Sequence, residues 1–373
     1  MKKRARELGI AIGTMAVGPM NAITDVSGVG VGHRTLIDGA NVRTGVTVVL
    51  PHEGDAWAEP VFAGAHRLNG NGEMTGLEWV RESGMLMSVI GITNTHSVGA
   101  VHEGLVAHEM ARRASTGAAW ALPVVAETWD GRLNDINGFH VRSEHVAEAM
   151  AAVSRGPVEE GNVGGGTGMV AFGFKAGIGT SSRVVPMPDG RACTMGVLVQ
   201  ANFGRRERLT VDGVPVGRFL TPDRIPLPDT NGQPHPDPAE AGSVIVIAAT
   251  DAPLLPHQCE RIAQRVSLGI GRIGGAGGNS SGDLFLCFAT GNRGLPPPDS
   301  ERPTPVRHAI EMFVDGHLDG LFNAVIEATE EAVLNAMLAA QTMTGANGVT
   351  AYALPHDELV RVLSQGWFPL RRD

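Results

Sequence analysis

Residues 242–249 read Gly-Ser-Val-Ile-Val-Ile-Ala-Ala, a β-branched run that predicts a strand in the core of a sheet. Apolar residues occupy both alternating sets of positions, which is typical of a strand that is covered on both faces. The preceding segment, residues 212–241, has almost no apolar periodicity and contains a turn signal, Asn231-Gly232, among many prolines. We therefore predict that a long loop ends at Ser243 and that this serine begins a buried strand.

Short β-rich runs and helical patterns alternate along the rest of the chain. Further strands are predicted over residues 46–50, 87–92, 124–127, 194–200 and 284–289. Apolar residues at helical spacing predict helices over residues 97–113, 143–153, 256–268 and 318–337. A second stretch rich in Pro and Gly, residues 291–305, is typical of a surface loop. This alternation, without an internal repeat, predicts a layered α/β fold.

The composition excludes several classes of partner. The 373 residues carry a formal charge of -9, and the 18% of charged residues have both signs spread along the chain. A protein that binds nucleic acid needs a basic stripe, so we expect no nucleic-acid partner. The longest apolar runs, residues 244–249 and 284–289, are about one strand long, whereas a membrane span needs about 20 residues. We therefore expect no membrane partner.

The cysteines and the first residues bear on the cellular location. Cys193, Cys259 and Cys287 are widely spaced in apolar surroundings, which favours reduced packing residues over a disulfide framework or a zinc site. The basic start of the chain is followed by a stretch that glycines and Pro19 interrupt, so it does not resemble a secretory signal. Both observations predict a cytoplasmic protein.

Several short motifs match known patterns but lie in the wrong context. Residues 269–274 fit G-x-G-x-x-G, yet they follow a helical pattern, whereas a dinucleotide site needs a preceding strand. Residues 278–282 fit G-x-S-x-G but lead into a strand, whereas a nucleophile elbow leads into a helix. A metal site on His102 and His108 is disfavoured because their spacing puts them on different helix faces. We expect a structural role for these histidines and for His66, His96 and His140.

A glycine run at residues 164–168, followed by another at 177–182, has three explanations that the sequence leaves open. The run can form an anion-binding nest, although it lacks the lysine of a phosphate loop. It can also line a substrate site, or simply make tight turns.

The Gly242-Ser243 junction is the sequence feature that points most directly to a chemical reaction. A serine at the entry to a buried strand suits an N-to-O acyl shift, in which its hydroxyl attacks the preceding carbonyl and hydrolysis then frees an α-amine. Such an amine has a pKa near 7.7 to 8.0 and can serve as the serine's own base. The same dipeptide is also common in ordinary turns, so both explanations stand on the residues alone.

Longer stretches resemble a known family, the DmpA aminopeptidases, which include the L-aminopeptidase/D-Ala-esterase-amidase and the β-peptidyl aminopeptidases. The resemblance runs from about residue 21 to about residue 292 and rests on residues 21–33, 42–46, 127–131, 133–138, 161–168, 242–243 and 249–258. It implies an αββα sandwich similar to the N-terminal-nucleophile hydrolases. It also implies a precursor that cleaves itself at Gly242-Ser243 into chains 1–242 and 243–373, with residues 212–241 as the processing loop of a single domain.

The resemblance also implies the roles of individual residues. Ser243 matches the nucleophile, and Asn202 matches the side-chain amide of the oxyanion hole. Ser281 and Asp283 match the family's serine and acidic partner, and their i, i+2 spacing predicts a short relay on one strand face beside Ser243. Glu127 matches the carboxylate that receives the substrate's free amine. We expect Trp129, two residues further on, to wall that pocket.

Together these observations predict a self-processing serine aminopeptidase that hydrolyses the N-terminal residue from short peptides, amides or esters, without metal or organic cofactor. Family members are commonly homo-oligomers, so we expect a homotetramer. An acyltransferase of the ornithine acetyltransferase type is the alternative on a similar fold, although those enzymes use a threonine nucleophile. A non-catalytic homologue is disfavoured because Ser243, Ser281 and Glu127 are all present. The preferred N-terminal residue, L-α, D-α or β, is left open.

Overall fold

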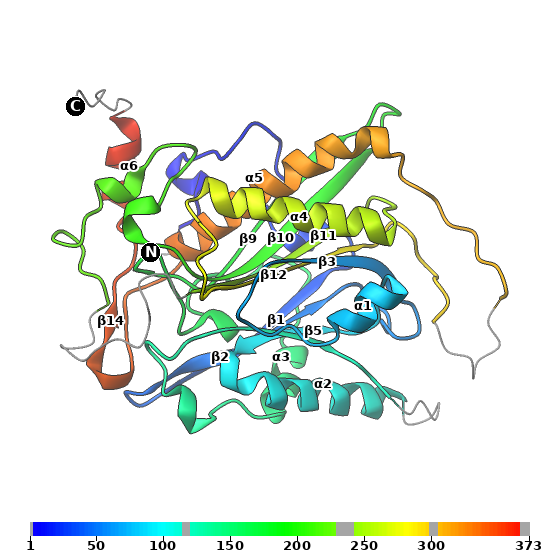
Figure 1. Ribbon diagram of the computed structural model, residues 1–373, viewed down its shortest axis with the longest axis horizontal. Helices are drawn as coiled ribbons and strands as arrows, with labels where there is room; N and C mark the ends of the chain where they lie inside the picture. The colour runs from blue at the N-terminus through cyan, green and yellow to red at the C-terminus, as the bar shows by residue number, and fades with distance from the viewer. Residues whose placement is uncertain (1–2, 114–119, 229–241, 298–304, 366–373) are drawn as a thin grey trace.

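The computed structural model describes residues 3–113, 120–228, 242–297 and 305–365. Within them, two β-sheets lie face to face, and helices cover the outer face of each sheet (Figure 1). These αββα layers confirm the fold class that the sequence predicts.

The larger sheet has six strands in the order β4-β3-β12-β11-β10-β9. Only β11 and β12, its two central strands, pair in parallel. Helices α4 (Pro256–Arg272) and α5 (Leu318–Leu338) cover its outer face. The strands are β3 (Val61–Gly70), β4 (Met85–Leu86), β9 (Ile178–Pro186), β10 (Ala192–Asn202), β11 (Ser243–Thr250) and β12 (Gly282–Ala289).

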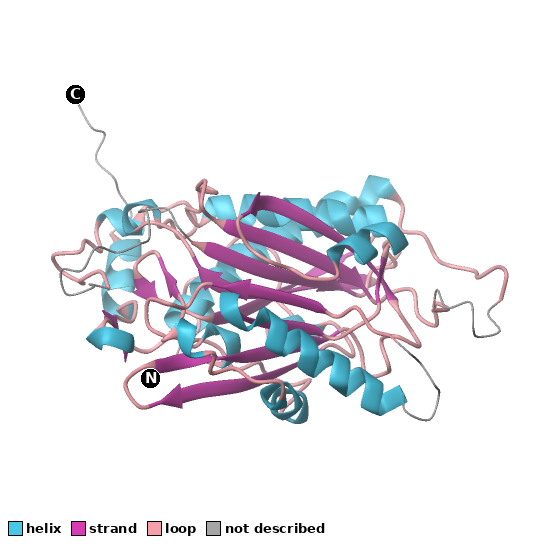
Figure 2. Ribbon diagram, turned by 60° about the horizontal axis from the view of Figure 1, so that its bottom comes forward, coloured by secondary structure: helices cyan, strands magenta, loops and turns pink. Residues whose placement is uncertain are grey.

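The smaller sheet has four strands in the order β1-β2-β5-β6, and α2 (Val98–Arg113) and α3 (Glu144–Ala151) cover its outer face. Figure 2 shows these helices and the strands above them from below. The strands are β1 (Gly30–Asp38), β2 (Val42–Leu50), β5 (Ile90–Asn94) and β6 (Val124–Thr128). The shorter elements are α1 (Leu77–Ser83), α6 (His356–Ser364), β7 (Val170–Ala171), β8 (Phe174–Lys175), β13 (Met343–Thr344) and β14 (Thr350–Ala351).

Strand β11 holds the layers together because its two faces belong to different cores. Val244, Val246 and Ala248 pack in the core beneath α4 and α5. Ile245 and Ile247 pack in the core between the two sheets. All of these side chains are fully buried, and burying one Val or Ile contributes about 1.5–3 kcal/mol. The β-branched run in the sequence thus fixes β11 at the centre of the sandwich.

Three predicted elements differ from the structure. Of the strand predicted over residues 87–92, only residues 90–92 form a strand, in β5, because residues 87–89 carry the chain from β4 in the larger sheet to the smaller sheet. Helix α4 continues to Arg272 and so includes Gly269 and Gly271, the first two glycines of the pattern at residues 269–274. Part of the predicted loop, residues 212–228, is anchored by buried Val216 and Leu220; residues 229–241 lie outside the described part of the chain.

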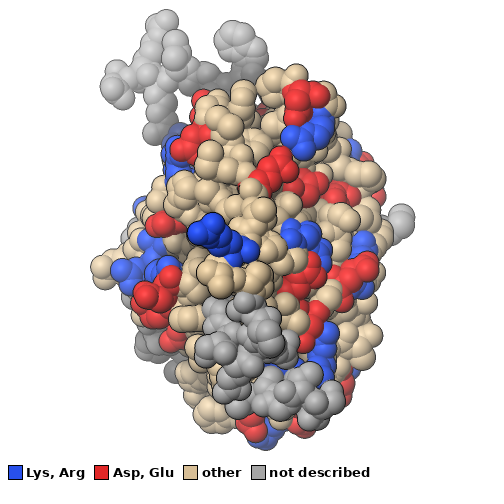
Figure 3. Space-filling model, turned by 90° about the vertical axis from the view of Figure 1, so that its right-hand side faces the viewer, with Lys and Arg blue, Asp and Glu red and all other residues tan. Residues whose placement is uncertain are grey.

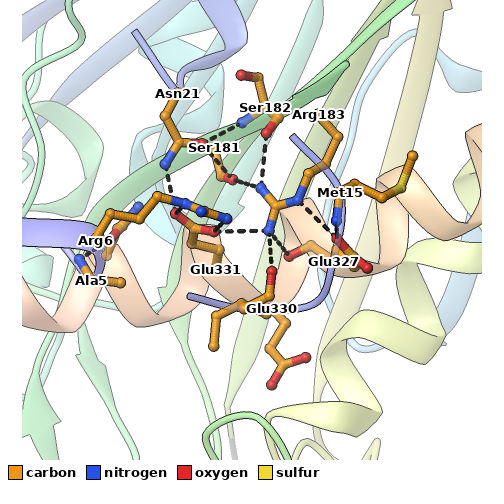
Figure 4. Close-up of polar contacts among 12 residues, drawn as sticks. Ala5, Arg6, Met15, Asn21, Ser181, Ser182, Arg183, Glu327, Glu330 and Glu331 are labelled. Carbon is orange, nitrogen blue, oxygen red and sulfur yellow. Dashed lines mark hydrogen bonds and ion pairs between the residues drawn. The ribbon is translucent and has the colours of Figure 1, made fainter. Parts of the chain in front are cut away.

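A buried ionic network ties the start of the chain to α5 (Figure 4). The guanidinium of Arg183, on β9, contacts Glu327 at 3.0 Å and Glu331 at 2.8 Å. Glu331 also accepts hydrogen bonds from Arg6 at 3.1 Å and from the Asn21 amide at 2.6 Å. Each buried charge thereby has a partner, which a buried ion requires. The segment from Arg6 to Asn21 is thereby held against α5, one of the two helices that cover the larger sheet.

On the face drawn in Figure 3, the Lys and Arg side chains are interspersed with Asp and Glu side chains. This mixture agrees with the spread of charge along the sequence. None of the described helices has both the length and the apolar character that a membrane crossing requires.

Candidate active site

Ser243 is the first residue of β11 and lies between the ends of β10 and β12. It pairs with Asn202 on β10 and with Gly282 on β12, and it is 4% exposed. Its hydroxyl oxygen accepts a hydrogen bond of 3.4 Å from the main-chain N–H of Trp129, in the segment that follows β6. The serine hydroxyl therefore lies where the ends of both sheets meet.

The peptide bond before Ser243 is held by the neighbouring strand. The carbonyl oxygen of Gly242 accepts a 3.1 Å hydrogen bond from the N–H of Gly282. A Cβ atom at residue 242 would lie 2.9 Å from both the Asn202 carbonyl oxygen and the Phe203 Cα, so this position favours glycine. The Gly282 N–H is a donor that sequence reasoning missed, because it depends on the register of β11 against β12.

The side-chain amide of Asn202 is fixed at both ends. Its oxygen accepts a 3.0 Å hydrogen bond from the Val170 N–H, and its nitrogen donates a 2.8 Å hydrogen bond to the Trp129 carbonyl oxygen. These partners settle which end of the amide is the nitrogen. Since that nitrogen has two protons, the second one can serve a substrate oxygen.

Ser281 and Asp283 are joined directly. The Ser281 hydroxyl donates to the Asp283 carboxylate at 2.6 Å, and the Asn69 amide donates to the other carboxylate oxygen at 3.2 Å. Burial raises the pKa of Asp283, and these two donors partly oppose the rise. The pair is therefore a hydroxyl held by a carboxylate, which is a common arrangement for proton transfer.

The strand register separates this pair from the Ser243 hydroxyl. Asp283 lies on the same face of β12 as Phe285, toward α4, whereas Ser243 lies on the same face of β11 as Ile245, toward the smaller sheet. Gly282 lies beside Ser243 between them. In the uncleaved chain the Ser281 hydroxyl thus bonds Asp283, and the Ser243 hydroxyl bonds Trp129. A relay that includes Ser243 stays a prediction.

Glu127 is a buried carboxylate near the end of β6. One of its oxygens accepts a 3.0 Å hydrogen bond from the Glu73 N–H, and the other accepts one from the Thr95 hydroxyl. Burial raises the pKa of Glu127, and the Thr95 donor is the main opposing influence. A Cβ at Gly72 would lie 3.1 Å from a Glu127 oxygen and 3.1 Å from the Gly282 Cα. Gly72 therefore packs closely against both the Glu127 carboxylate and Gly282, the residue that pairs with Ser243.

Trp129 follows the last residue of β6 and contributes through its main chain as well as its ring. Its N–H and C=O contact Ser243 and Asn202, which the sequence did not reveal. Its half-buried ring lies over Gly131, where a Cβ would come within 2.6 Å of the indole. The expected role of the ring as a pocket wall stays a prediction.

Two further buried ionisable residues, Lys175 and Asp130, were missed from the sequence. The Lys175 ammonium donates to the carbonyl oxygens of Ala176 at 2.6 Å and Met169 at 2.7 Å. Burial lowers the pKa of Lys175 well below its usual value, and the charge of Asp130 opposes this. Burial raises the pKa of Asp130 to about 7. Lys175 thus closes the loop that carries Val170, the residue that orients Asn202.

The glycine run at residues 164–168 is in close contact with strands of both sheets. A Cβ at Gly165 would lie 2.3 Å from the Gln200 side-chain oxygen, and one at Gly166 would lie 2.4 Å from the Ile178 N atom. Close approach of neighbouring chain segments therefore favours glycine at these two positions, a reason that was not among the three explanations from the sequence.

Two facing sheets between helix layers, with a serine heading a central strand, define the class of hydrolases that use an N-terminal nucleophile. The chain belongs to Peptidase family S58, whose model matches residues 21–351. It is thus an aminopeptidase of that family, as the DmpA resemblance predicted.

Individual relatives agree with this assignment. The β-peptidyl aminopeptidase BapA of Sphingosinicella microcystinivorans is 47% identical over 97% of this chain and 92% of its own length. A β-aminopeptidase structure from Burkholderia sp. is 48% identical, with a TM-score of 0.90 over 98% of this chain and 100% of that one. The L-aminopeptidase D-Ala-esterase/amidase of Ochrobactrum anthropi, described as a variant of the Ntn hydrolase fold, is 45% identical, with a TM-score of 0.88 over 98% and 99%.

Proposed function

We propose that the chain cleaves itself between Gly242 and Ser243 and then removes the N-terminal residue from short peptides, amides or esters through an acyl-enzyme on Ser243. The observation that carries this proposal is the position of the buried Glu127 carboxylate, which packs against Gly72, a residue that also packs against Gly282 beside the serine. A nucleophile next to a fixed negative charge suits substrates whose reacting carbonyl lies near a free ammonium group.

Self-cleavage begins with the peptide bond that precedes the nucleophile. The Ser243 oxygen attacks the Gly242 carbonyl carbon, and the Gly282 N–H stabilises the negative charge that develops on the carbonyl oxygen. The C–N bond then breaks, the hydroxyl proton passes to the departing Ser243 nitrogen, and an ester remains. Water hydrolyses this ester, which leaves a carboxylate on Gly242 and a free amine and hydroxyl on Ser243.

Substrate hydrolysis uses the same serine with its new amine as the base. The amine takes the hydroxyl proton as the oxygen attacks the substrate carbonyl, and Asn202 donates its second N–H to the oxyanion. The proton then passes to the leaving amine, and Ser281 with Asp283 supports this transfer. Water releases the N-terminal residue from the acyl-enzyme, while Glu127 holds the substrate ammonium throughout.

The test begins with a denaturing gel of the purified protein, on which we expect two bands. Edman sequencing of the smaller band should begin Ser-Val-Ile-Val, and Ser243→Ala should give one inactive, uncleaved chain. A different N-terminus, or one intact chain with activity, contradicts the mechanism. Hydrolysis of p-nitroanilides of L-Ala, D-Ala and β-Ala then defines the preferred residue, and the names of the relatives support including the β-amino acid.

The alternative, an acyltransferase, is separated from the hydrolase by its product. An acyltransferase passes the acyl group from Ser243 to an added amine, whereas a hydrolase passes it to water. We keep the homotetramer and the cytoplasmic location as proposals, and light scattering of the purified protein tests the first.

A further inference from the structure

The side-chain amide of Asn202 is held from two sides, and each side is built around a different buried ionisable residue. On one side the Val170 N–H donates to the amide oxygen at 3.0 Å, and Lys175 closes the loop that carries Val170. On the other side the amide nitrogen donates to the Trp129 carbonyl oxygen at 2.8 Å. That carbonyl belongs to the planar peptide group that joins Trp129 to Asp130. The placement of Asp130 therefore helps to set the direction of this second hydrogen bond.

Asp130 is fully buried, and both its main chain and its side chain anchor the turn that follows β6. Its carbonyl oxygen accepts hydrogen bonds of 3.0 Å from the N–H groups of Leu133 and Asn134. Its carboxyl oxygen Oδ1 accepts another, also of 3.0 Å, from the Asn134 side chain. The side-chain oxygen of Asn134 in turn accepts a 3.0 Å hydrogen bond from the Arg43 N–H on β2. The Asp130 carboxyl group thus links the turn after Trp129 to the smaller sheet.

The surroundings of this carboxyl group are polar and closed to solvent. The Thr44 hydroxyl and the Asn94 amide, both buried in the smaller sheet, lie close enough to lower its pKa against the larger rise that burial causes. Within the described part of the chain, its other oxygen, Oδ2, has no hydrogen bond of good geometry. Burying an incompletely bonded carboxyl group costs stability. A role other than stability is therefore indicated for Asp130.

The two sides of the Asn202 amide also contact each other. A Cβ at Gly168 would lie 2.8 Å from the Asp130 Cβ, so the loop that leads to Val170 packs directly against Asp130. The charge of Asp130 acts on Lys175, whose ammonium donates to carbonyl oxygens of the same loop. The two buried ionisable residues thus form one unit behind the amide.

We propose that Asp130 is a positioning residue for the oxyanion donor. It fixes the peptide group between Trp129 and Asp130, and this peptide group directs the second N–H of Asn202 toward the substrate oxygen. The inference rests on the proposed function, in which Asn202 stabilises the oxyanion. A residue that only supports the fold affects turnover whether or not Asn202 is present, whereas a residue that positions Asn202 matters only while that amide is there.

The test is a double-substitution cycle of Asp130→Ala and Asn202→Ala, with kcat and KM measured on the p-nitroanilide that the wild type hydrolyses fastest. Removal of one oxyanion donor costs about 10²–10³ in kcat, and we expect this loss for Asn202→Ala. Asp130→Ala should lower kcat by about tenfold or more with little change in KM, because the oxyanion forms only after attack on the carbonyl. In the Asn202→Ala background, the same substitution should lower kcat by less than about threefold.

Two further variants accompany the cycle. Asp130→Asn keeps one acceptor oxygen for the Asn134 amide and should regain most of the kcat that Asp130→Ala loses. Asp135→Asn is the matched control and should keep the wild-type kcat, because this carboxylate lies in the same segment but is exposed and contacts His140 at 3.3 Å. Each rate is expressed per cleaved enzyme, measured from the two bands on the gel, so incomplete maturation does not distort it.

Three results overturn the positioning role. The first is an equal fold loss of kcat for Asp130→Ala with and without the Asn202 amide, and the second is a wild-type kcat in Asp130→Ala. The third is failure of both Asp130 variants to fold or mature, which would make the residue structural. Failure of the oxyanion assignment in the proposed function looks different, since Asn202→Ala would then keep the wild-type kcat, and the positioning role would fall with it.

Discussion

Replacing Glu127 by Gln tests the amine receptor with little change of shape. Both carboxylate oxygens accept hydrogen bonds, from Glu73 N–H and from the Thr95 hydroxyl, and the side chain is 3% exposed. An amide keeps this volume but loses the charge that faces a substrate ammonium. A charge-assisted hydrogen bond contributes about 1.5–3 kcal/mol, which corresponds to about a 10- to 150-fold rise in KM. We expect kcat to change much less.

The pH profile gives a second signature of Glu127. Burial raises the pKa of this carboxyl group, so it becomes protonated at a higher pH than an exposed glutamate. As the pH falls through that raised pKa, the charge that binds the ammonium is lost, and kcat/KM for free-amine substrates should fall. Glu127→Gln cannot titrate and should lose the part of the acid limb that belongs to Glu127, while the part that comes from protonation of the Ser243 amine remains.

The assay is steady-state hydrolysis of one p-nitroanilide and of its N-acetylated form. The wild type should fail on the acetylated substrate, which has no ammonium. Glu73→Gln is the matched control, because Glu73 is exposed and its hydrogen bond to Glu127 comes from the main-chain N–H, which the substitution keeps; loss of the Glu73 charge should only lower the pKa of Glu127. Equal cleavage of free and acetylated substrates by the wild type, or an unchanged KM in Glu127→Gln, refutes the receptor role.

Two further predictions concern the groups around the nucleophile. Ser281→Ala removes the hydroxyl that donates to Asp283 and should lower kcat by about 10² or more, whereas the neighbouring Ser280→Ala should not; wild-type rates in Ser281→Ala would make it a turn residue. Lys175→Met removes the donor that holds the loop that positions Asn202, and it should lower kcat about tenfold at constant KM, because we propose that Asn202 acts on the oxyanion. Circular dichroism checks the fold of this variant. A change in KM as large as the change in kcat would argue against a role of Lys175 in positioning Asn202.

The fold could be predicted largely because its central strands are continuous apolar runs. Residues 244–249 and 284–289 are buried on both faces and became β11 and β12. Residues 87–92 misled the prediction, since an apolar run does not show where a chain passes from one sheet to another. Strand β1 was missed because its second half is largely exposed and polar, which removes the period on which a strand prediction depends.

In the candidate site, the sequence predicted the functional side chains but not the main-chain donors. Ser243, Asn202, Ser281, Asp283 and Glu127 came from the family resemblance, which reads residue types at positions. The roles of the Trp129 and Gly282 N–H groups could not be predicted in this way, because almost every residue type has a main-chain N–H. Only the three-dimensional arrangement of the strands directs these two N–H groups to Ser243 and Gly242. Lys175 has no motif around it, and only its burial beside Asp130 reveals it.

The strand order β4-β3-β12-β11-β10-β9 has a consequence for the matured enzyme. The proposed cleavage after Gly242 would leave β11 and β12 on one polypeptide, flanked on both sides by strands of the other. The larger sheet would then be shared between the two products, with β11 and β12 of one inserted between β10 and β3 of the other, and neither product has the complete larger sheet alone. Once unfolded, they must meet again in a bimolecular step, with sheet edges exposed to aggregation. The proposed cleavage would therefore replace one continuous chain with a two-chain assembly. The lifetime of that assembly depends on its rate of unfolding.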